Sequence, residues 1–430
     1  MIKQAIATLL LFTAVTAQEP VLRDRTAGDK VFFETESVYG ANAHSLFALY
    51  RIRYDNLIFT LTNGINGSTY SAAADVAVEI LDSTGESISR QISEIRMTAS
   101  TNLINDLRKQ YFQGAMTFSL PPGRYSVLLR LEDKESDNRI PDIKRPMTPP
   151  ASGVPILSTF IPVQDQNAAT GEFISYNLGG DVIFSQNFGL VTAHSTPGMD
   201  SARYTISQWD VEEETTTIIA DTVVRLHSFP NTSLQLKHDS VNVRFVTTQE
   251  NTSTVYYIPV TGNMIRQGRY NITIRFEDSS KTTLPFGARW PDMPLSLSDL
   301  EIATLPLQHL LTREEYSELR RGGRETRIRK FDEFWSRKDP TPGTAYNELM
   351  AEFYRRVDYT VGAFRTLKEQ NGSITDRGRI YILYGKPSST DRILRPGTIP
   401  QEIWEYTNLG KKFIFKDQSR QGNYTLTESQ

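Results

Sequence analysis

The chain has 430 residues, no cysteine and a formal net charge of −3. This length predicts about two to four domains, since domains commonly have roughly 100–200 residues. The lack of cysteine excludes disulfides, thiolate zinc sites, a cysteine nucleophile and a lipid-modified N-terminal cysteine. Because acidic and basic residues nearly balance, we expect no nucleic-acid partner.

Residues 1–17 are typical of a signal peptide. Lys3 gives a positive start, an apolar run follows from Ala5 to Thr16, and Val15-Thr16-Ala17 has the small-x-small pattern of a signal-peptidase site. We therefore expect cleavage after Ala17 and export, either to the periplasm or out of the cell. The apolar run is shorter than the ~20 residues that a membrane-spanning helix needs, and we expect no transmembrane segment elsewhere.

A repeated segment predicts two copies of one β module. Gly123 to Asp133 (GRYSVLLRLED) recurs with similar apolar residues as Gly268 to Asp278 (GRYNITIRFED). In each copy, apolar and polar residues alternate after a glycine turn, as they do in a half-buried antiparallel strand. We expect this strand to be the last of its module. Tyr125 and Tyr270 can pack their rings inward while their hydroxyls reach the backbone, as corner tyrosines of immunoglobulin-like sandwiches do.

Short strand-like runs separated by turn residues fill the chain up to about residue 290. They predict two immunoglobulin-like β-sandwich modules, at 18–140 and 154–290. Residues 141–153 concentrate proline and lack a hydrophobic period, so we expect a linker there. The other expected strands are 47–62 and 75–81 in the first module, and 180–184, 202–209, 217–226, 234–237, 241–247 and 254–260 in the second.

After residue 295 the pattern changes to the helical period, which predicts a smaller α+β domain at 296–430. Thr312-Arg313-Glu314-Glu315 is a capping box and predicts a short helix. Further helices should lie around Phe331–Trp335 and over about 344–366. We expect three closing strands at 379–384, 402–407 and 412–417, the first central and covered by helices, and the last two joined by a turn at 407–410.

This part of the chain contains six ordered sequence blocks: Phe331-x-x-Phe334-Trp335-x-x-Lys338-Asp339-Pro340-Thr341-Pro342-x-Thr344, Asn347-Glu348, Tyr354-x-Arg356-Val357, Thr375-Asp376-Arg377-Gly378-Arg379-Ile380-Tyr381, Gly385-x-Pro387 and Glu402-Ile403-Trp404-x-Tyr406. Together they resemble the GWxTD domain, a family of exported bacterial proteins, over about residues 296–420. The family signature is Gly-Trp-x-Thr-Asp, and here Ser373 replaces the tryptophan. The resemblance implies a fold and a compartment but no reaction.

Five polar residues of these blocks are candidates for an anion or ligand site: Glu348, Arg356, Asp376, Arg377 and Arg379. They would form such a site if they converged in one cleft. We favour a structural role, since an Asp-Arg pair at a turn also caps helices and ties loops together. The chain has no recognised catalytic motif, and its five histidines lack metal-ligand spacing. We therefore assign no catalytic residue, metal or cofactor.

Residues 320–330 (RRGGRETRIRK) form the densest basic run of the chain. We interpret the run as a solvated joint between helices. The alternative is an anion-facing patch for lipid head groups, a surface polysaccharide or an acidic partner.

These features favour a non-enzymatic interaction or scaffold protein of the cell envelope, whose C-terminal domain binds other envelope or secreted proteins. One alternative is an enzyme or small-anion receptor with a site around Asp376 and Arg377. Another is carbohydrate binding by the β-sandwiches, which exposed aromatic platforms would indicate. The sequence leaves open the oligomeric state, the choice between periplasm and secretion, and any peripheral attachment to the envelope.

Overall fold

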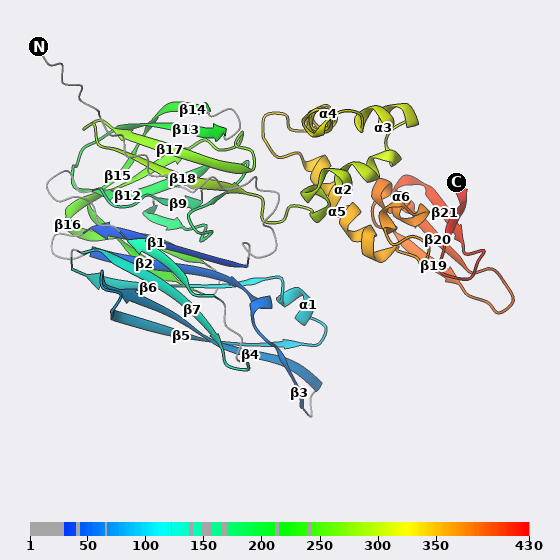
Figure 1. Cartoon of the computed structure of the whole chain (residues 1–430), viewed down its shortest axis with the longest axis horizontal. Coiled ribbons are helices and arrows are strands. Elements are labelled where there is room, and N and C mark those ends of the chain that lie inside the picture. Colours follow the sequence, from blue (N-terminus) through cyan, green and yellow to red (C-terminus); the bar gives the residue numbers. More distant parts are fainter. Residues whose placement is uncertain are drawn as a thin grey trace, which may run out of the picture.

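The computed structural model describes residues 30–39, 44–64, 67–121, 123–136, 141–147, 157–164, 170–210, 215–239 and 242–429. The expected signal peptide, with its cleavage site at Ala17, lies outside these residues. The described chain is mostly β, with largely antiparallel sheets up to residue 289 and an α+β region after it (Figure 1). None of the described helices is long and apolar enough to cross a membrane.

The first β unit has two sheets that face each other across one apolar core. One sheet has the order β1-β2-β6, and the other β3-β4-β7-β8 with β5 also paired to β4. Side chains alternate along each strand, so Ala48 and Tyr50 of one sheet meet Val76 and Val78 of the other. The elements are β1 Val31–Tyr39, β2 His44–Arg53, β3 Thr60–Gly64, β4 Gly67–Leu81, β5 Ser87–Ser100, α1 Ile104–Leu107, β6 Tyr111–Leu120, β7 Tyr125–Asp133 and β8 Ile143–Met147.

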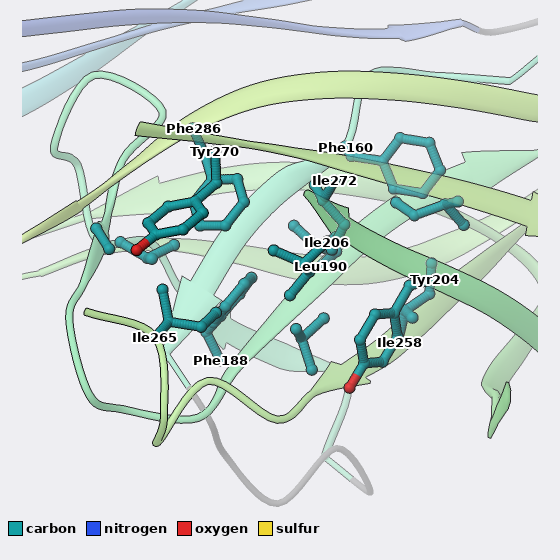
Figure 2. Close-up of a cluster of buried hydrophobic side chains, with 14 of the residues drawn as sticks. Phe160, Phe188, Leu190, Tyr204, Ile206, Ile258, Ile265, Tyr270, Ile272 and Phe286 are labelled. Atoms are coloured by element: carbon teal, nitrogen blue, oxygen red, sulfur yellow. The ribbon is translucent and has the colours of Figure 1, made fainter. Parts of the chain in front are cut away.

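The second β unit also has two facing sheets. Their orders are β10-β16-β12-β9, with β15 also paired to β16, and β11-β18-β17-β13-β14. Figure 2 shows their shared core, in which Leu190 and Ile258 of one sheet lie near Ile206 and Ile272 of the other. The strands are β9 Ile161–Gln164, β10 Glu172–Ile174, β11 Val182–Ile183, β12 Phe188–His194, β13 Ser201–Asp210, β14 Thr215–Arg225, β15 His227–His238, β16 Val243–Val260, β17 Gly268–Phe276 and β18 Lys281–Arg289.

A third apolar core joins the two β units. Phe47 and Leu49 alternate with the inward residues of β2 and therefore project from the opposite face of its sheet. They pack against Val191, Phe245 and Tyr257 of the second unit, and the rings of Phe47 and Phe245 lie 5.5 Å apart between centroids. The sheet β1-β2-β6 is thus covered on both faces. The four sheets form a stack of four layers, as Figure 1 shows.

Two buried carboxyl groups lie in this joint. Glu34 and Glu36 project from β1 on the same face as Phe47 and Leu49, as the register of β1 on β2 requires. The Glu34 carboxylate accepts hydrogen bonds from the Gly180 amide at 2.6 Å and from Ser175 Oγ at 3.1 Å. Burial raises the pKa of Glu34 to about 7 and that of Glu36 to about 8.

The repeated strands keep the orientation that the sequence predicts. Tyr125 and Tyr270 begin the inward face of β7 and β17, and their hydroxyls donate to the backbone oxygens of Pro121 and Arg266 at 2.9 and 3.0 Å. The prediction that each is the last strand of its unit is wrong, because β8 pairs with β7 and β18 with β17. Each repeat continues through a turn into one more antiparallel strand.

Part of the expected linker is strand β8. Pro146 lies within it, opposite Ser126 of β7. Proline has no amide hydrogen to donate to a neighbouring strand. Because β8 is the edge strand of its sheet, its backbone groups on one side need no partner strand. The rest of 141–153 lies mostly outside the described residues.

The C-terminal region packs helices against a sheet of order β19-β20-β21-β22. The predicted capping box is confirmed, since Thr312 and Glu315 exchange side-chain and backbone hydrogen bonds. The predicted turn at 407–410 is also confirmed, with Gly410 in the left-handed conformation. The elements are α2 Leu300–Thr304, α3 Arg313–Leu319, α4 Arg324–Ser336, α5 Glu348–Ala363, α6 Asp376–Tyr384, β19 Ser389–Ile393, β20 Gln401–Tyr406, β21 Lys411–Lys416 and β22 Thr425–Ser429.

The expected central strand at 379–384 is wrong, because these residues belong to helix α6. Thr375 caps the helix by accepting a hydrogen bond from the Gly378 amide at 3.1 Å, and Gly385 ends it with a φ of 79°. A short apolar run is compatible with either structure, because periodicity alone does not distinguish a helix from a strand over so few residues. The Thr375 cap and the terminal Gly385 favour the helix.

Three aromatic rings attach the C-terminal region to the second β unit. Trp290 lies between Phe184 and Tyr346, at centroid distances of 4.9 and 5.5 Å. The Tyr346 amide donates to Ser185 Oγ at 2.9 Å, and the Ala345 amide donates to the Asn263 oxygen at 2.8 Å. The loop before α5 is therefore held by both apolar and backbone contacts.

The glutamates in the joint predict a pH dependence of stability. Their folded pKa values lie above the ordinary value of 4.5, so the folded state binds more protons between about pH 4.5 and 8. The free energy of unfolding should therefore be highest near pH 5 and fall as the pH rises to 8. In the double variant Glu34→Gln/Glu36→Gln this slope should flatten, measured by urea unfolding at several pH values. The exposed control Glu86→Gln should keep it, and parallel curves for the wild type and the double variant would contradict the assignment.

Candidate functional site

The signature segment of the C-terminal region is a site of close backbone packing. Residues Gly372–Ile374 form a 3-10 turn (η5) directly before α6. A Cβ atom on Gly372 would overlap the carbonyl oxygen of Thr360 in α5, and one on Gly378 would overlap the carbonyl oxygen of Gly372. Thr375 joins the two, because its Oγ1 donates to Gly372 O at 2.8 Å and accepts from the Gly378 amide. The segment places α6 against α5.

Asp376 connects α6 to the last strand. Its Oδ2 accepts a hydrogen bond from the Leu426 amide of β22 at 2.8 Å, and its Oδ1 lies 3.4 Å from Arg379 Nη2. The Arg379 pair is partly exposed and spans one helical turn, so we expect it to contribute little to stability. This carboxylate therefore fixes the edge of the sheet.

Arg377 forms a buried ion pair. Its Nη1 lies 3.1 Å from Glu402 Oε2, and the guanidinium packs over the rings of Phe364 and Tyr424. The other oxygen of Glu402 accepts a hydrogen bond from Trp404 Nε1 at 2.8 Å. Both charges are thus compensated in the interior, where an unpaired charge would be costly. The pair anchors α6 to β20.

The remaining two candidates lie apart from this pair. Glu348 is exposed at the first turn of α5 and accepts a hydrogen bond from Thr341 Oγ1 at 2.5 Å. Arg356 bonds Glu352 at 2.8 Å and donates to the Ile382 oxygen at 3.3 Å. Of the five candidates, the described contacts bring Asp376 and Arg379 together, while Glu348, Arg356 and Arg377 each have different partners.

An exposed face lies beside these residues on α5 and α6, and we name it the Tyr359 face. It consists of Leu349, Glu352, Arg356 and Tyr359, which follow one another at helical spacing on α5, and of Tyr381 on α6. Tyr359 is 54% exposed, and its ring stacks on that of Tyr381 with centroids 4.6 Å apart. Neither tyrosine is among the five residues that the sequence suggested, although Tyr359 stands on the polar side of the helix beside Arg356 and Tyr381 ends one of the family blocks.

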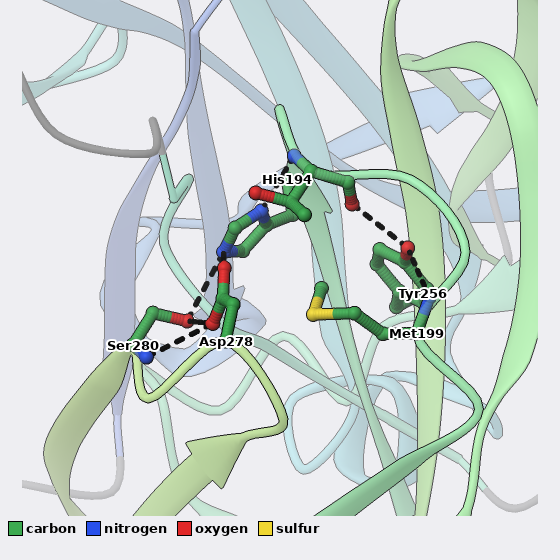
Figure 3. Close-up of polar contacts among 6 residues, drawn as sticks. His194, Met199, Tyr256, Asp278 and Ser280 are labelled. Carbon is green, nitrogen blue, oxygen red and sulfur yellow. Dashed lines mark hydrogen bonds and ion pairs between the residues drawn. The ribbon is translucent and has the colours of Figure 1, made fainter.

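A second polar cluster surrounds the buried His194 (Figure 3). Its Nδ1 accepts a hydrogen bond from the Thr196 amide at 2.9 Å, so the ring proton is on Nε2. That nitrogen lies 3.1 Å from Ser280 Oγ, while Ser280 donates to Asp278 at 2.6 Å. Burial lowers the pKa of His194, which keeps the ring neutral.

These are the residue types of a hydrolytic triad, but their roles differ. A general base needs a free nitrogen toward the serine, and here Nε2 of His194 carries the proton. The cluster instead holds the β17-β18 turn against β12. Among the described residues, no group of three or more His, Asp and Glu side chains could hold a metal ion.

The basic run at 320–330 is largely neutralised by its neighbours, which supports the interpretation as a joint between helices. The run connects α3, which carries Glu318, to α4, which carries Glu333, while Glu301 lies on α2. The ion pairs are Arg320 and Arg327 with Glu301, Arg321 and Lys330 with Glu318, and Arg329 with Glu333.

The family comparison identifies this region. Residues 268–430 match the GWxTD domain model. The chain therefore carries a C-terminal GWxTD domain. The match begins earlier than the expected residue 296 and includes β17 and β18 of the second β unit. Within the signature, the position of Ser373 is buried, so a side chain there packs inside the GWxTD domain.

Comparisons with curated proteins and with solved structures do not indicate a function. No curated protein matched the sequence. Solved structures with local similarity include trypsin-activated α2-macroglobulin of Escherichia coli (8% identity, TM-score 0.17, covering 61% of this chain and 17% of that one). Red sea bream transglutaminase has 8% identity and a TM-score of 0.16, covering 60% of this chain and 31% of that one. The C-terminal domain of Streptococcus pyogenes AspA has 7% identity and a TM-score of 0.14, covering 60% and 99%. Scores this low support no argument about the fold.

The signature glycines give a sharp test of the structural role. Gly378→Ala should destabilise the GWxTD domain by about 3 kcal/mol or more, because the new methyl group meets a backbone oxygen that cannot move aside. The control is Gly362→Ala in α5, where a Cβ meets nothing within 4 Å. Its stability should stay the same or rise by up to about 1 kcal/mol. Urea unfolding followed by circular dichroism would measure both, and equal effects would contradict the packing described.

Proposed function

We propose that the protein is an exported, non-enzymatic interaction protein of the cell envelope, and that its GWxTD domain binds a protein partner through the Tyr359 face. The exposed stack of Tyr359 on Tyr381 beside Arg356 carries this proposal. Tyrosine and arginine are enriched among the residues that dominate protein–protein affinity. Glu352 and Leu349 extend the face with a charged and an apolar contact.

In this proposal the two β units are immunoglobulin-like sandwiches that carry the GWxTD domain. The corner hydrogen bonds of Tyr125 and Tyr270 support the assignment. The stacked sheets and the aromatic contacts of Trp290 would hold the binding face in one position relative to the β units. The pattern at residues 1–17 supports export to the periplasm or beyond, where other envelope or secreted proteins are the available partners.

The alternative site around Asp376 and Arg377 has less support. Both side chains have partners within the fold, Leu426 for the aspartate and Glu402 for the arginine. A ligand would have to compete with these contacts. We therefore do not favour an enzyme or an anion receptor at this position.

Carbohydrate binding is a second candidate, supported by one observation. Trp209 on β13 is 52% exposed, whereas Trp290, Trp335 and Trp404 are buried. An exposed indole beside polar strand residues can stack on a sugar ring. Binding of the wild type to a glycan array that is lost in Trp209→Ala would support this role. If the wild type binds no glycan on the array, the role is contradicted.

Site-specific photocrosslinking in cells tests the proposed face. A benzoylphenylalanine at position 359 should capture an envelope protein, whereas the same group at Tyr316, a half-exposed tyrosine on α3, should not. With the captured partner purified, Tyr359→Ala and Arg356→Ala should each weaken binding at least about tenfold, and Tyr316→Ala should leave it unchanged. Equal capture at both positions, or no partner at position 359, would rule out this face.

A further inference from the structure

A cavity of about 220 Å³ lies between β1 and the core of the second β unit. Most of its wall is apolar and comes from the two facing sheets of that unit. Figure 2 shows five of the lining residues, Phe160, Phe188, Leu190, Ile272 and Phe286. Three of them are phenylalanines. The partly exposed Thr35 and the exposed Pro285 also line the cavity, so it reaches the surface between the two units.

One carboxyl group interrupts the apolar wall. Glu36 of β1 lines the cavity and is only 7% exposed. Thr159, which also lines the cavity, provides its hydrogen bond. Glu36 makes no ion pair with any described residue, which is unusual for a buried carboxyl group. A partner for this group could therefore enter through the cavity.

Neighbouring charges select the kind of partner. Glu34 lies two residues away on the same face of β1, and its carboxylate already accepts hydrogen bonds from Gly180, which lines the cavity, and from Ser175. Asp181 is nearby, but Arg269 and Arg289 already neutralise it. An anionic ligand would oppose the ionisation of Glu36, whereas a cation would form an ion pair with its carboxylate.

We propose that this cavity binds a small primary amine with an apolar body. Its ammonium group bonds to the Glu36 carboxylate, and its body packs among the rings of Phe160, Phe188 and Phe286. Aromatic faces also attract an ammonium group. An apolar cavity of about 150 Å³ holds benzene, so the larger space here accommodates a ring with an aminomethyl group.

Binding is coupled to the release of a proton. Burial raises the pKa of Glu36 to about 8, so the carboxyl group is mostly protonated at pH 7 before the ligand enters. The ammonium group favours the ionised carboxylate, and the proton of Glu36 passes to the solvent. One ion pair forms and about one proton leaves per ligand at pH 7.

Isothermal titration of the mature full-length chain with benzylamine tests the proposal. We expect saturable binding to the wild type, and a heat that differs between buffers of different ionisation enthalpy because a proton is released. Glu36→Gln should weaken binding at least about tenfold, which corresponds to about 1.4 kcal/mol. Glu86→Gln is the control, because it removes a carboxylate at an exposed site away from the cavity, and it should leave binding unchanged.

Two further measurements separate specific binding from loss of folding or mere apolar filling. Benzyl alcohol has the same shape without the charge and should bind at least about tenfold more weakly. Leu284→Phe, which narrows the cavity at a partly buried position, should weaken both ligands while circular dichroism stays native. No benzylamine binding to the wild type, equal binding of the two ligands, or full binding by folded Glu36→Gln would overturn the proposal.

Discussion

The sheet β1-β2-β6 is covered on both faces, and the arrangement of the other layers follows from this burial. A sheet with one polar face can lie at the surface of a protein, whereas a sheet that is apolar on both faces needs another layer packed on each of them. In β2, Ala48 and Tyr50 pack into the core of the first β unit, while Phe47 and Leu49 pack into the core that joins the two units. Separating the two β units would expose the second set to water. They therefore behave as one four-layered body.

The same burial explains the two unusual glutamates of β1. A polar side chain on a doubly covered strand lies between two layers, so Glu34 and Glu36 are buried in the joint. Glu34 finds donors on the loop after β10, whereas Glu36 faces the cavity. Burying such groups costs free energy unless each has a partner. The joint thus combines apolar contact, which favours association, with carboxyl groups that favour it only while they are protonated or paired.

In this chain, the residues of the GWxTD signature hold parts of the domain together. Gly372 and Gly378 allow backbones to touch, Thr375 caps α6, and Arg377 ties that helix to Glu402 of the sheet. Residues that build a fold in this way are poor candidates for ligand binding, because a ligand would compete with their structural partners. The proposed binding face lies beside them, where Tyr359 is exposed to solvent.

Local patterns predicted those features that depend on local interactions. The alternation after Gly123 and Gly268, the capping box at Thr312 and the turn at Gly410 all rest on contacts within a few residues. The run at 379–384 was misread because an apolar run this short does not show a period that distinguishes helix from strand. The doubly covered sheet depends on contacts between distant segments, so only the structure reveals it.

The candidate site was predictable in part for the same reason. Asp376 and Arg377 stand in a recognisable motif, and the preferred structural role for them agrees with their contacts to Leu426 and Glu402. Tyr359 has no motif, and its exposure depends on how α5 packs. The cavity beside Glu36 is lined by strands far apart in the sequence, from β1 to β18, so no local pattern could indicate it.

Native-state hydrogen exchange across a denaturant series tests the shared β body most directly. If the doubly covered sheet joins the two β units, the slowest amides of β2, in the first unit, and of β12 and β16, in the second, should open in one common step with the same free energy and denaturant dependence. Opening of the β2 amides at clearly lower free energy, with β12 and β16 still protected, would contradict the account. The two units would then fold as separate bodies.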